Sequence, residues 1–385
     1  TKLIPNSYEY EVYYGENITM EVFYATMDDT PIKNANFTLE ISGIPTFTYS
    51  YYYNDTSGWY VFIIPSNQSV FDVGTYIMSI NFTKTHYKSQ GIVVKIVISR
   101  IPTKLLPSQE NVYVYYGENI SVDVFYATLD DKAIANAAFN IVMLGVDSFN
   151  FTWYYNDSSG HYVFIIPSNQ SAFDINTYVI NITFSKPYYE TKTVLIRVFI
   201  NPIPTRVIPS TRNIIVYYCE NVFFYIIFET LEGIPIYNAD ISLEIVGIGA
   251  VNYTVYYNSS IQAYVFFFNI ENVGLVEGKY VLNINLAKKY YQSQEVTIEL
   301  TIKPIDTSVY YIDAYTFYVD ENVIIVIKYY DDVSDVYIPN ATLIYVLQYV
   351  SQESILINST TSQNGTYVIF IEALYLEPGT YLLQF

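Results

Sequence analysis

The sequence has very few residues of the kinds that build disulfide, metal and haem sites. Its 385 residues include one cysteine, two histidines, two tryptophans and four methionines. A single cysteine excludes a disulfide framework within the chain, and no Cys/His pattern typical of a zinc or haem site is present. Any stable fold must therefore rest on the packing of apolar side chains.

Charged residues are also scarce, and most of them are acidic. They make up 14% of the chain, and the net charge is −19. Nucleic-acid binding needs Lys and Arg at phosphates, so this balance predicts no nucleic-acid partner. The longest apolar run, residues 222–228, is far below the ~18 residues of a membrane span. The first five residues show no signal-peptide pattern. We expect no transmembrane segment in this chain.

What the sequence does contain is aromatic residues and a long internal repeat. It has 45 Tyr and 23 Phe, and 51% of its residues are hydrophobic, enough to bury cores. Tyr-Tyr-Gly-Glu-Asn at 13–17 returns at 115–119, as Tyr-Tyr-Cys-Glu-Asn at 217–221, and in degenerate form at 318–322. The dipeptide Asn-Ala recurs every 102 residues, and Ile-Pro-Thr stands at 101–103 and 203–205. Four domains are predicted, residues 1–102, 103–204, 205–306 and 307–385, joined by short, stiff proline junctions.

Each repeat is predicted to consist of β-strands. Apolar alternation and turn clusters place strands of the first repeat near 8–13, 18–25, 36–43, 46–53, 59–64, 75–82 and 91–98. Seven strands in ~100 residues predict an immunoglobulin-like sandwich. The segment 72–76, Asp-Val-Gly-Thr-Tyr, is typical of the tyrosine corner of that fold. Met78, Ile180, Leu282 and Leu383 stand where an antibody domain has its second cysteine. We expect most of the tyrosines to face the cores.

The repeat resembles the bacterial-type immunoglobulin-like modules found in tandem in prokaryotic, especially archaeal, cell-surface proteins. Their pattern is Tyr-x-Gly-Glu/Asp-Asn, an apolar strand, Pro-Ile-x-Asn-Ala and Gly-x-Tyr. The first copy has Tyr14-Gly15-Glu16-Asn17 and Pro31-Ile32-Lys33-Asn34-Ala35, and the third has Pro235-Ile236-Tyr237-Asn238-Ala239. The resemblance covers the whole chain. It implies an all-β tandem array of four immunoglobulin-like domains, and stalks, adhesins, layers and filaments all use such modules.

Fifteen Asn-x-Ser/Thr sequons predict covalent N-glycans. Several of them fall on strand faces that alternation assigns to the outside. A sugar coat would also explain a soluble surface with so few charges. The candidate sites are Asn17, Asn36, Asn54, Asn67, Asn81, Asn119, Asn150, Asn156, Asn169, Asn181, Asn252, Asn258, Asn340, Asn358 and Asn364.

The outward face of the strand predicted at 18–25 is mostly polar in the first two repeats and apolar in its third-repeat counterpart. This change predicts an interface. In the first repeat it carries Thr19, Glu21 and Phe23, and in the second Ser121, Asp123 and Phe125. The third repeat has Phe223, Tyr225 and Ile227 there, and the fourth has Ile324, Val326 and Lys328. An exposed apolar stripe marks a contact surface, so we expect self-association or contact with neighbouring surface proteins. Loops of the same domain could instead cover it.

Catalytic and cofactor chemistry is not expected. His86 and His161 occupy different places in their repeats. Cys219 replaces a turn glycine; it is a neutral replacement, or a thiol available for an intermolecular disulfide. The recurring Glu16, Glu118, Glu220 and Glu321, with the acidic turns at 28–29, 130–131 and 331–332, would be solvated; calcium is the alternative. We therefore predict no enzyme, no catalytic or metal residues and no cofactor, with calcium left possible.

The fourth repeat stops one strand early. Phe385 corresponds to Ile284, and the third repeat continues from there through a turn and a final strand. Later residues of the same protein could complete the sandwich, or another subunit could donate the strand. These features together predict a structural extracellular glycoprotein of a surface filament, an S-layer or a stalk. The alternative is an adhesin or a carbohydrate-binding receptor.

Overall fold

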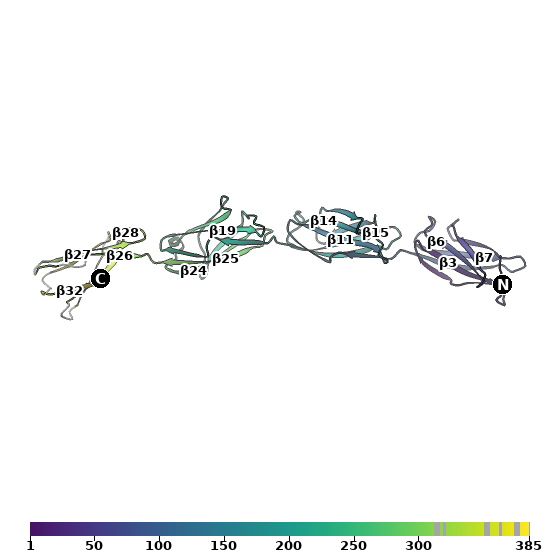
Figure 1. The fold of residues 1–385 in the computed structure, drawn as a ribbon, viewed down its shortest axis with the longest axis horizontal. Coiled ribbons are helices and arrows are strands. Elements are labelled where there is room, and N and C mark those ends of the chain that lie inside the picture. The colour runs from purple at the N-terminus through teal and green to yellow at the C-terminus, as the bar shows by residue number, and fades with distance from the viewer. Residues whose placement is uncertain (312–315, 319–320, 350–354, 362–363, 373–377, 385) are drawn as a thin grey trace. The chain divides into compact units, whose positions relative to one another are not determined.

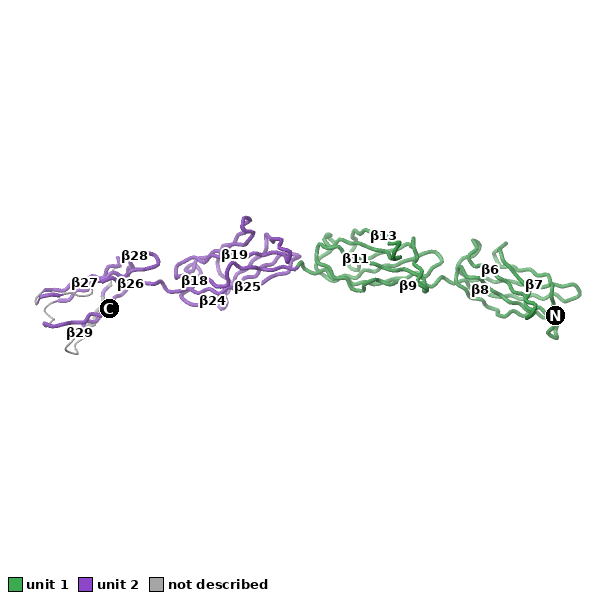
Figure 2. The backbone as a smooth tube through the Cα atoms, in the orientation of Figure 1, with its two compact units in different colours: residues 1–203 green, residues 204–385 purple. Residues whose placement is uncertain are grey.

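The computed structural model describes the chain except for residues 312–315, 319–320, 350–354, 362–363, 373–377 and 385 (Figure 1). The chain forms two compact units, residues 1–203 and 204–385 (Figure 2). In both, β-strands are the main secondary structure, and the described residues include one short helix. Within the described ranges, no helix is long and apolar enough to cross a membrane.

The first repeat is a sandwich of two four-stranded sheets, ordered β1-β3-β6-β5 and β2-β8-β7-β4. Its strands are β1 (Lys2–Pro5), β2 (Glu9–Tyr13), β3 (Asn17–Ala25), β4 (Asn36–Ile41), β5 (Ser50–Asn54), β6 (Trp59–Pro65), β7 (Gly74–Thr83) and β8 (Gln90–Ser99). β1 runs antiparallel to β3, whereas β2 runs parallel to β8 in the other sheet. The chain therefore changes sheets just after Pro5, which has no N–H to continue a ladder. This order is that of an immunoglobulin-like sandwich.

The second repeat has the same two sheets, ordered β13-β14-β11-β9 and β10-β16-β15-β12. Its strands are β9 (Thr103–Pro107), β10 (Asn111–Tyr115), β11 (Asn119–Thr128), β12 (Ala138–Met143), β13 (Thr152–Asn156), β14 (His161–Pro167), β15 (Asn176–Ser185) and β16 (Lys192–Asn201). The third repeat adds a two-residue strand and a short helix to this plan. Its elements are β17 (Thr205–Pro209), β18 (Asn213–Tyr217), β19 (Asn221–Thr230), β20 (Asp240–Ile245), β21 (Gly249–Ala250), β22 (Thr254–Asn258), β23 (Ala263–Asn269), α1 (Ile270–Val273), β24 (Gly278–Ala287) and β25 (Gln294–Lys303).

The fourth repeat is smaller and differently paired. Its strands are β26 (Thr307–Tyr310), β27 (Val323–Asp331), β28 (Val336–Tyr337), β29 (Thr342–Tyr349), β30 (Ile355–Thr361), β31 (Thr366–Ile371) and β32 (Tyr381–Gln384). β30 pairs with β29, whereas its counterparts β5, β13 and β22 pair in the opposite sheet. In the described part of this repeat no strand follows β32. The prediction of an all-β tandem array of immunoglobulin-like sandwiches is confirmed.

The strands of the first repeat agree with the sequence prediction apart from β1, which was not predicted, and β5, which begins at Ser50 rather than near residue 46. The alternation of β7 is also confirmed: Met78, Ile80 and Phe82 are fully buried, while Ile77 and Asn81 are exposed. The tyrosine corner is present. The hydroxyl of Tyr76 donates to the carbonyl of Asp72 (2.9 Å) and accepts from its N–H (2.7 Å). Met78, Ile180 and Leu282 fill the core at the usual disulfide position.

A second tyrosine recurs in all four repeats and holds a loop in place. The buried hydroxyl of Tyr162 accepts from the N–H of Ala137 (2.8 Å) and donates to the carbonyl of Ile134 (2.9 Å). Between them Asn136 has a left-handed backbone (φ 55°), which asparagine adopts more readily than most residues. This explains the Asn-Ala dipeptide that repeats along the sequence. The same pair of hydrogen bonds is made by Tyr60, Tyr264 and Tyr367.

The tyrosines divide between the cores and the surface, so the expectation that most of them face the cores holds in part. Among the described residues eight tyrosines are buried and seventeen are exposed. Strand β5 shows the reason. It is the outermost strand of its sheet, so Tyr51 is exposed although it lies on the inward-facing side and its ring still contacts Phe37. Fourteen further described tyrosines are half-buried and pack against the cores, so the tyrosine excess belongs to the cores as well as to the surface.

Candidate functional site

The third repeat exposes an aromatic face, formed here by Phe223, Tyr225, Tyr256 and Phe267. Phe223 and Phe267 are cross-strand partners on β19 and β23, with exposed fractions of 61% and 40%. Tyr225 is 37% exposed, and Tyr256 on β22 is exposed as well. Ile227, which was also predicted to lie on this face, is less exposed than the others, because it is half-buried. Loops of the same domain do not cover this face.

The fourth repeat also exposes apolar residues on the corresponding strand, β27. Ile324 and Val326 are 54% and 42% exposed on β27. Their cross-strand partners on β31 are Phe370 and Val368, which are exposed too. Both predicted interface strands therefore present exposed apolar side chains. The neighbouring strands β23 and β31 add residues that the alternation of one strand could not reveal.

Fourteen of the fifteen sequon asparagines have described side chains, and none of the fourteen is buried. In Asn54, Asn156 and Asn258 the side-chain Oδ1 accepts backbone N–H bonds from the following turn. Attachment of a sugar uses Nδ2 and leaves that oxygen free to accept. The ten exposed asparagines are Asn17, Asn36, Asn67, Asn81, Asn119, Asn150, Asn169, Asn252, Asn340 and Asn364, while Asn54, Asn156, Asn181 and Asn258 are half-buried. The side chain of Asn358 lies outside the described part.

The recurring glutamates close turns of the backbone. A carboxylate oxygen of Glu16 accepts from the N–H of Tyr13 (2.8 Å), and Glu118, Glu220 and Glu321 repeat this contact. In the acidic turns Asp29 pairs with Lys2 and Asp131 with Lys104. Among the described residues no three His, Cys, Asp or Glu side chains gather into a group able to hold a metal ion.

We expect removal of calcium to leave the stability of the chain unchanged, because these carboxylates are already satisfied by N–H groups and lysines. The measurement is the melting temperature with excess chelator and with added calcium, with magnesium as the control for ionic strength. A melting temperature that rises with calcium alone would contradict this expectation.

Cys219 occupies a turn position that strains it. Gly15 and Gly117, its counterparts, have φ values of 97° and 96°, and Cys219 keeps a left-handed φ of 70°. Its exposed thiol donates to a carboxylate oxygen of Glu271 (3.0 Å). The carboxylate beside it, with partial burial, raises the pKa of this thiol to about 11. The thiol is therefore neutral at physiological pH.

Cys219 should consequently react slowly with alkylating agents despite its exposure. A pKa raised from 9.0 to about 11 lowers the thiolate fraction at neutral pH about 100-fold. The Glu271→Gln variant should restore a normal rate, which is measured by iodoacetamide labelling and mass spectrometry at pH 8. Equal rates in both proteins would contradict the role of Glu271.

Within the unit 1–203, a short junction couples two sandwiches. The N–H of Ile101 donates to the carbonyl of Tyr188 (2.9 Å), and the carbonyl of Ile101 accepts from Glu190 (3.0 Å). The ring of Tyr14 stacks on that of Tyr188, with centroids 3.8 Å apart and planes 1° from parallel. Tyr188 has a left-handed backbone (φ 69°) that brings its ring to this position. The sequence predicted a stiff proline junction, but neither tyrosine.

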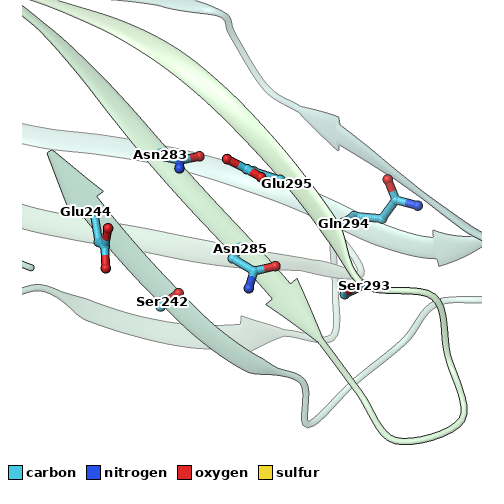
Figure 3. A pocket seen from close by; sticks show the side chains of 7 residues that line it. All are labelled: Ser242, Glu244, Asn283, Asn285, Ser293, Gln294 and Glu295. Atoms are coloured by element: carbon cyan, nitrogen blue, oxygen red, sulfur yellow. The ribbon is translucent and has the colours of Figure 1, made fainter. Parts of the chain in front are cut away.

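The outer face of the other sheet of the third repeat contains a polar cleft with a volume of ≈ 410 Å³. Figure 3 shows Asn283 and Asn285 on β24, Ser242 and Glu244 on β20, and Glu295 at the start of β25. The sequence patterns did not single out these residues, because polar residues on an outward face are usually solvated. His86 and His161 are not part of the cleft; they lie in the first two repeats.

No protein-family model matches the sequence, and no match was found among curated proteins. Among solved structures the chain is similar to invasin, a bacterial integrin-binding protein, with 11% identity over 99% of this chain and 78% of that one and a TM-score of 0.36. It is similar to the Escherichia coli adhesin FdeC, with 12% identity over 78% and 96% of the two chains and a TM-score of 0.26. It is also similar to the Yersinia pseudotuberculosis adhesin InvE, with 10% identity over 51% of this chain and 58% of that one and a TM-score of 0.26.

Identities and TM-scores this low carry no argument about function. Sheet order, the tyrosine corner and the repeated loop clamp carry the structural conclusion. The chain is a tandem array of immunoglobulin-like modules.

Proposed function

We propose that the chain is part of an N-glycosylated protein of a prokaryotic, archaeal cell surface and acts mechanically, as a stalk, filament or layer of tandem domains. The observation that carries the proposal is the position of the sequons: none of the fourteen with described side chains is buried. Sugars at these positions would solvate a surface that has little charge and many exposed aromatic rings.

The packing of the domains suits a load-bearing role. Each sandwich has a dry core without a disulfide, as in the second repeat, where Phe164, Ile182 and Phe184 are fully buried. The junction at Ile101 is tied by backbone hydrogen bonds and a ring stack, which resist bending of the unit that contains them. A chain built this way needs no active site, and an enzymatic role is not part of the proposal.

Lateral contacts are assigned to the aromatic face of the third repeat and its continuation at Ile324 and Val326 on the fourth. Exposed rings at positions where the first repeat has threonine and glutamate, and the second serine and aspartate, favour a partner surface, either a second copy or a neighbouring surface protein. The second candidate function is that of an adhesin. The polar cleft on the other sheet of the third repeat favours it, because an adhesin needs a surface site for a ligand.

Glycopeptide mapping of the native protein tests the proposal. We expect sugars on Asn17, Asn67, Asn119 and Asn169, which are exposed and recur as pairs between the first two repeats. Asn283 and Asn285 are the internal control, because Asn-x-Ser/Thr is not completed at either of them. Unmodified sequons in native material would contradict the proposal. Electron microscopy of the same material should show periodic fibres or layers.

A further inference from the structure

The polar cleft of the third repeat differs from the same place in the first two repeats. A shift of 102 residues per repeat places Asn81 and Gly91 of the first repeat, and Thr183 and Thr193 of the second, at the positions of Asn285 and Glu295. These are cross-strand partners in all three repeats. The comparison therefore concerns one position in three sandwiches.

In the first two repeats the two residues at this position contact each other. The Oδ1 atom of Asn81 lies over Gly91, so close that an added Cβ would be 2.4 Å from it. The hydroxyls of Thr183 and Thr193 bond to each other at 2.9 Å. At this cross-strand position the two side chains or backbones contact each other in the first two repeats, whereas in the third repeat, which the structure describes throughout, Asn285 and Glu295 make no such contact.

In the third repeat the corresponding side chains are open. Within the described residues no hydrogen bond or ion pair involves the side chains of Ser242, Glu244, Asn283, Asn285 or Glu295. The Oδ1 of Asn283 is buried without a partner, as is that of its second-repeat counterpart Asn181, and an unpaired buried acceptor is unfavourable until a donor reaches it. What is particular to the third repeat is that Glu244, Asn285 and Glu295 surround this atom. Carboxylates, amides and a hydroxyl from three adjacent strands therefore face one cleft with their hydrogen-bonding capacity unused (Figure 3).

We propose that this cleft binds a neutral saccharide. Neighbouring hydroxyls of a sugar ring can donate to the glutamate and amide oxygens and accept from the amide N–H groups. The volume of ≈ 410 Å³ lies within the ~300–1,000 Å³ range of small-molecule sites. Two glutamates in a chain of net charge −19 oppose an acidic sugar. The lining residues include no aromatic ring or aliphatic side chain, which argues against an apolar ligand.

The absence of a stacking ring among the lining residues also predicts weak binding. Affinity then comes from hydrogen bonds to exposed side chains, each of which adds little in water. A single cleft would bind weakly, and repeated copies along a surface would add avidity. The inference does not require this chain to carry glycans. The saccharide could belong to a neighbouring copy or to another cell surface.

The test uses the full chain of 385 residues, produced without glycans. Chitobiose and mannobiose serve as neutral probes and sialyllactose as the acidic one, with binding followed by saturation-transfer NMR and titration. The variants N283S and E295T place in the cleft the residues found at Ser79 and Thr193 in the sister repeats, so folding should be preserved. E40V is the matched control, because Glu40 occupies the position of Glu244 in the first repeat.

We expect a neutral disaccharide to bind at millimolar concentration, sialyllactose not to bind, and E40V to leave binding unchanged. The double variant N283S/E295T should bind at least tenfold more weakly, as the loss of two or three hydrogen bonds requires. Unchanged binding in the double variant, preference for sialyllactose, or no binding of either neutral probe would overturn the inference. Heat from calcium alone, lost in E295T, would reassign the cleft to a cation and overturn it too. If the glycosylated native chain binds added sugar less well, its own glycans are the source of the ligand.

Discussion

Replacing Tyr162 by phenylalanine is expected to lower the free energy of unfolding of the second repeat by about 2–4 kcal/mol. The hydroxyl joins two backbone groups in the core, the N–H of Ala137 and the carbonyl of Ile134. The ring would remain, so packing is kept while both groups lose their partner. An unpaired buried donor or acceptor costs about 1–3 kcal/mol, which makes this a large effect for the loss of one oxygen.

Hydrogen exchange measures this effect in one repeat of a multidomain chain. The amide of Ala137 donates to the lost hydroxyl, so its exchange should become at least ~30-fold faster, the equivalent of about 2 kcal/mol. Tyr154→Phe is the matched control, because its hydroxyl is exposed on the edge strand β13 and bonds to no described residue. Equal protection of Ala137 in both variants would mean that the hydroxyl does not hold the loop.

Returning the aromatic face to the residues of the first repeat, with F223T and Y225E, is expected to weaken self-association about 100-fold. Burial of an aromatic side chain contributes roughly 1.5–3 kcal/mol, and a charge placed in an apolar contact opposes it further. Thr19 and Glu21 occupy the same positions of β3 in the first repeat, so the sandwich accommodates both. Folding should therefore be unchanged while association is lost.

Sedimentation of the full chain over a range of concentrations tests this prediction. Tyr52→Thr is the control, since Tyr52 is exposed on the first repeat but lies outside the proposed face. The T19F/E21Y double variant supplies the opposite change and should increase association. A chain that stays monomeric at all concentrations, or one whose association is insensitive to F223T/Y225E, would remove the lateral contact from the proposed function.

Much of the fold could be predicted because the same strand and turn pattern recurs in successive repeats. Alternation at 75–82 correctly assigned the faces of β7, and Tyr76 identified the corner before it. Strand β1 was missed because four residues ending in Pro5 show too little alternation. The exposure of Tyr51 was missed for a different reason. Alternation tells which side of a strand a residue is on, but not whether the strand lies at the edge of its sheet.

The candidate sites divide in the same way. The exposure of Phe223 and Tyr225 could be predicted from the sequence, because the contrast with Glu21 and Asp123 is local to one strand; their role in an interface stays a prediction. Tyr188 at the junction and the Asn283 cleft were not, because each depends on residues far apart in the chain.

By itself the sequence determined the class of the molecule: an all-β array of four related domains, rich in sequons and without a disulfide framework. Local patterns are enough for this, because strand periodicity and turn residues are visible within short segments. The 102-residue repeat is visible when the sequence is compared with itself. Tertiary structure decided which side chains are left without partners. Glu295 and Asn285 stand ten residues apart and look like ordinary surface residues. Only the pairing of β24 with β25, and of β20 with β24, places their unused oxygens and amides in one cleft.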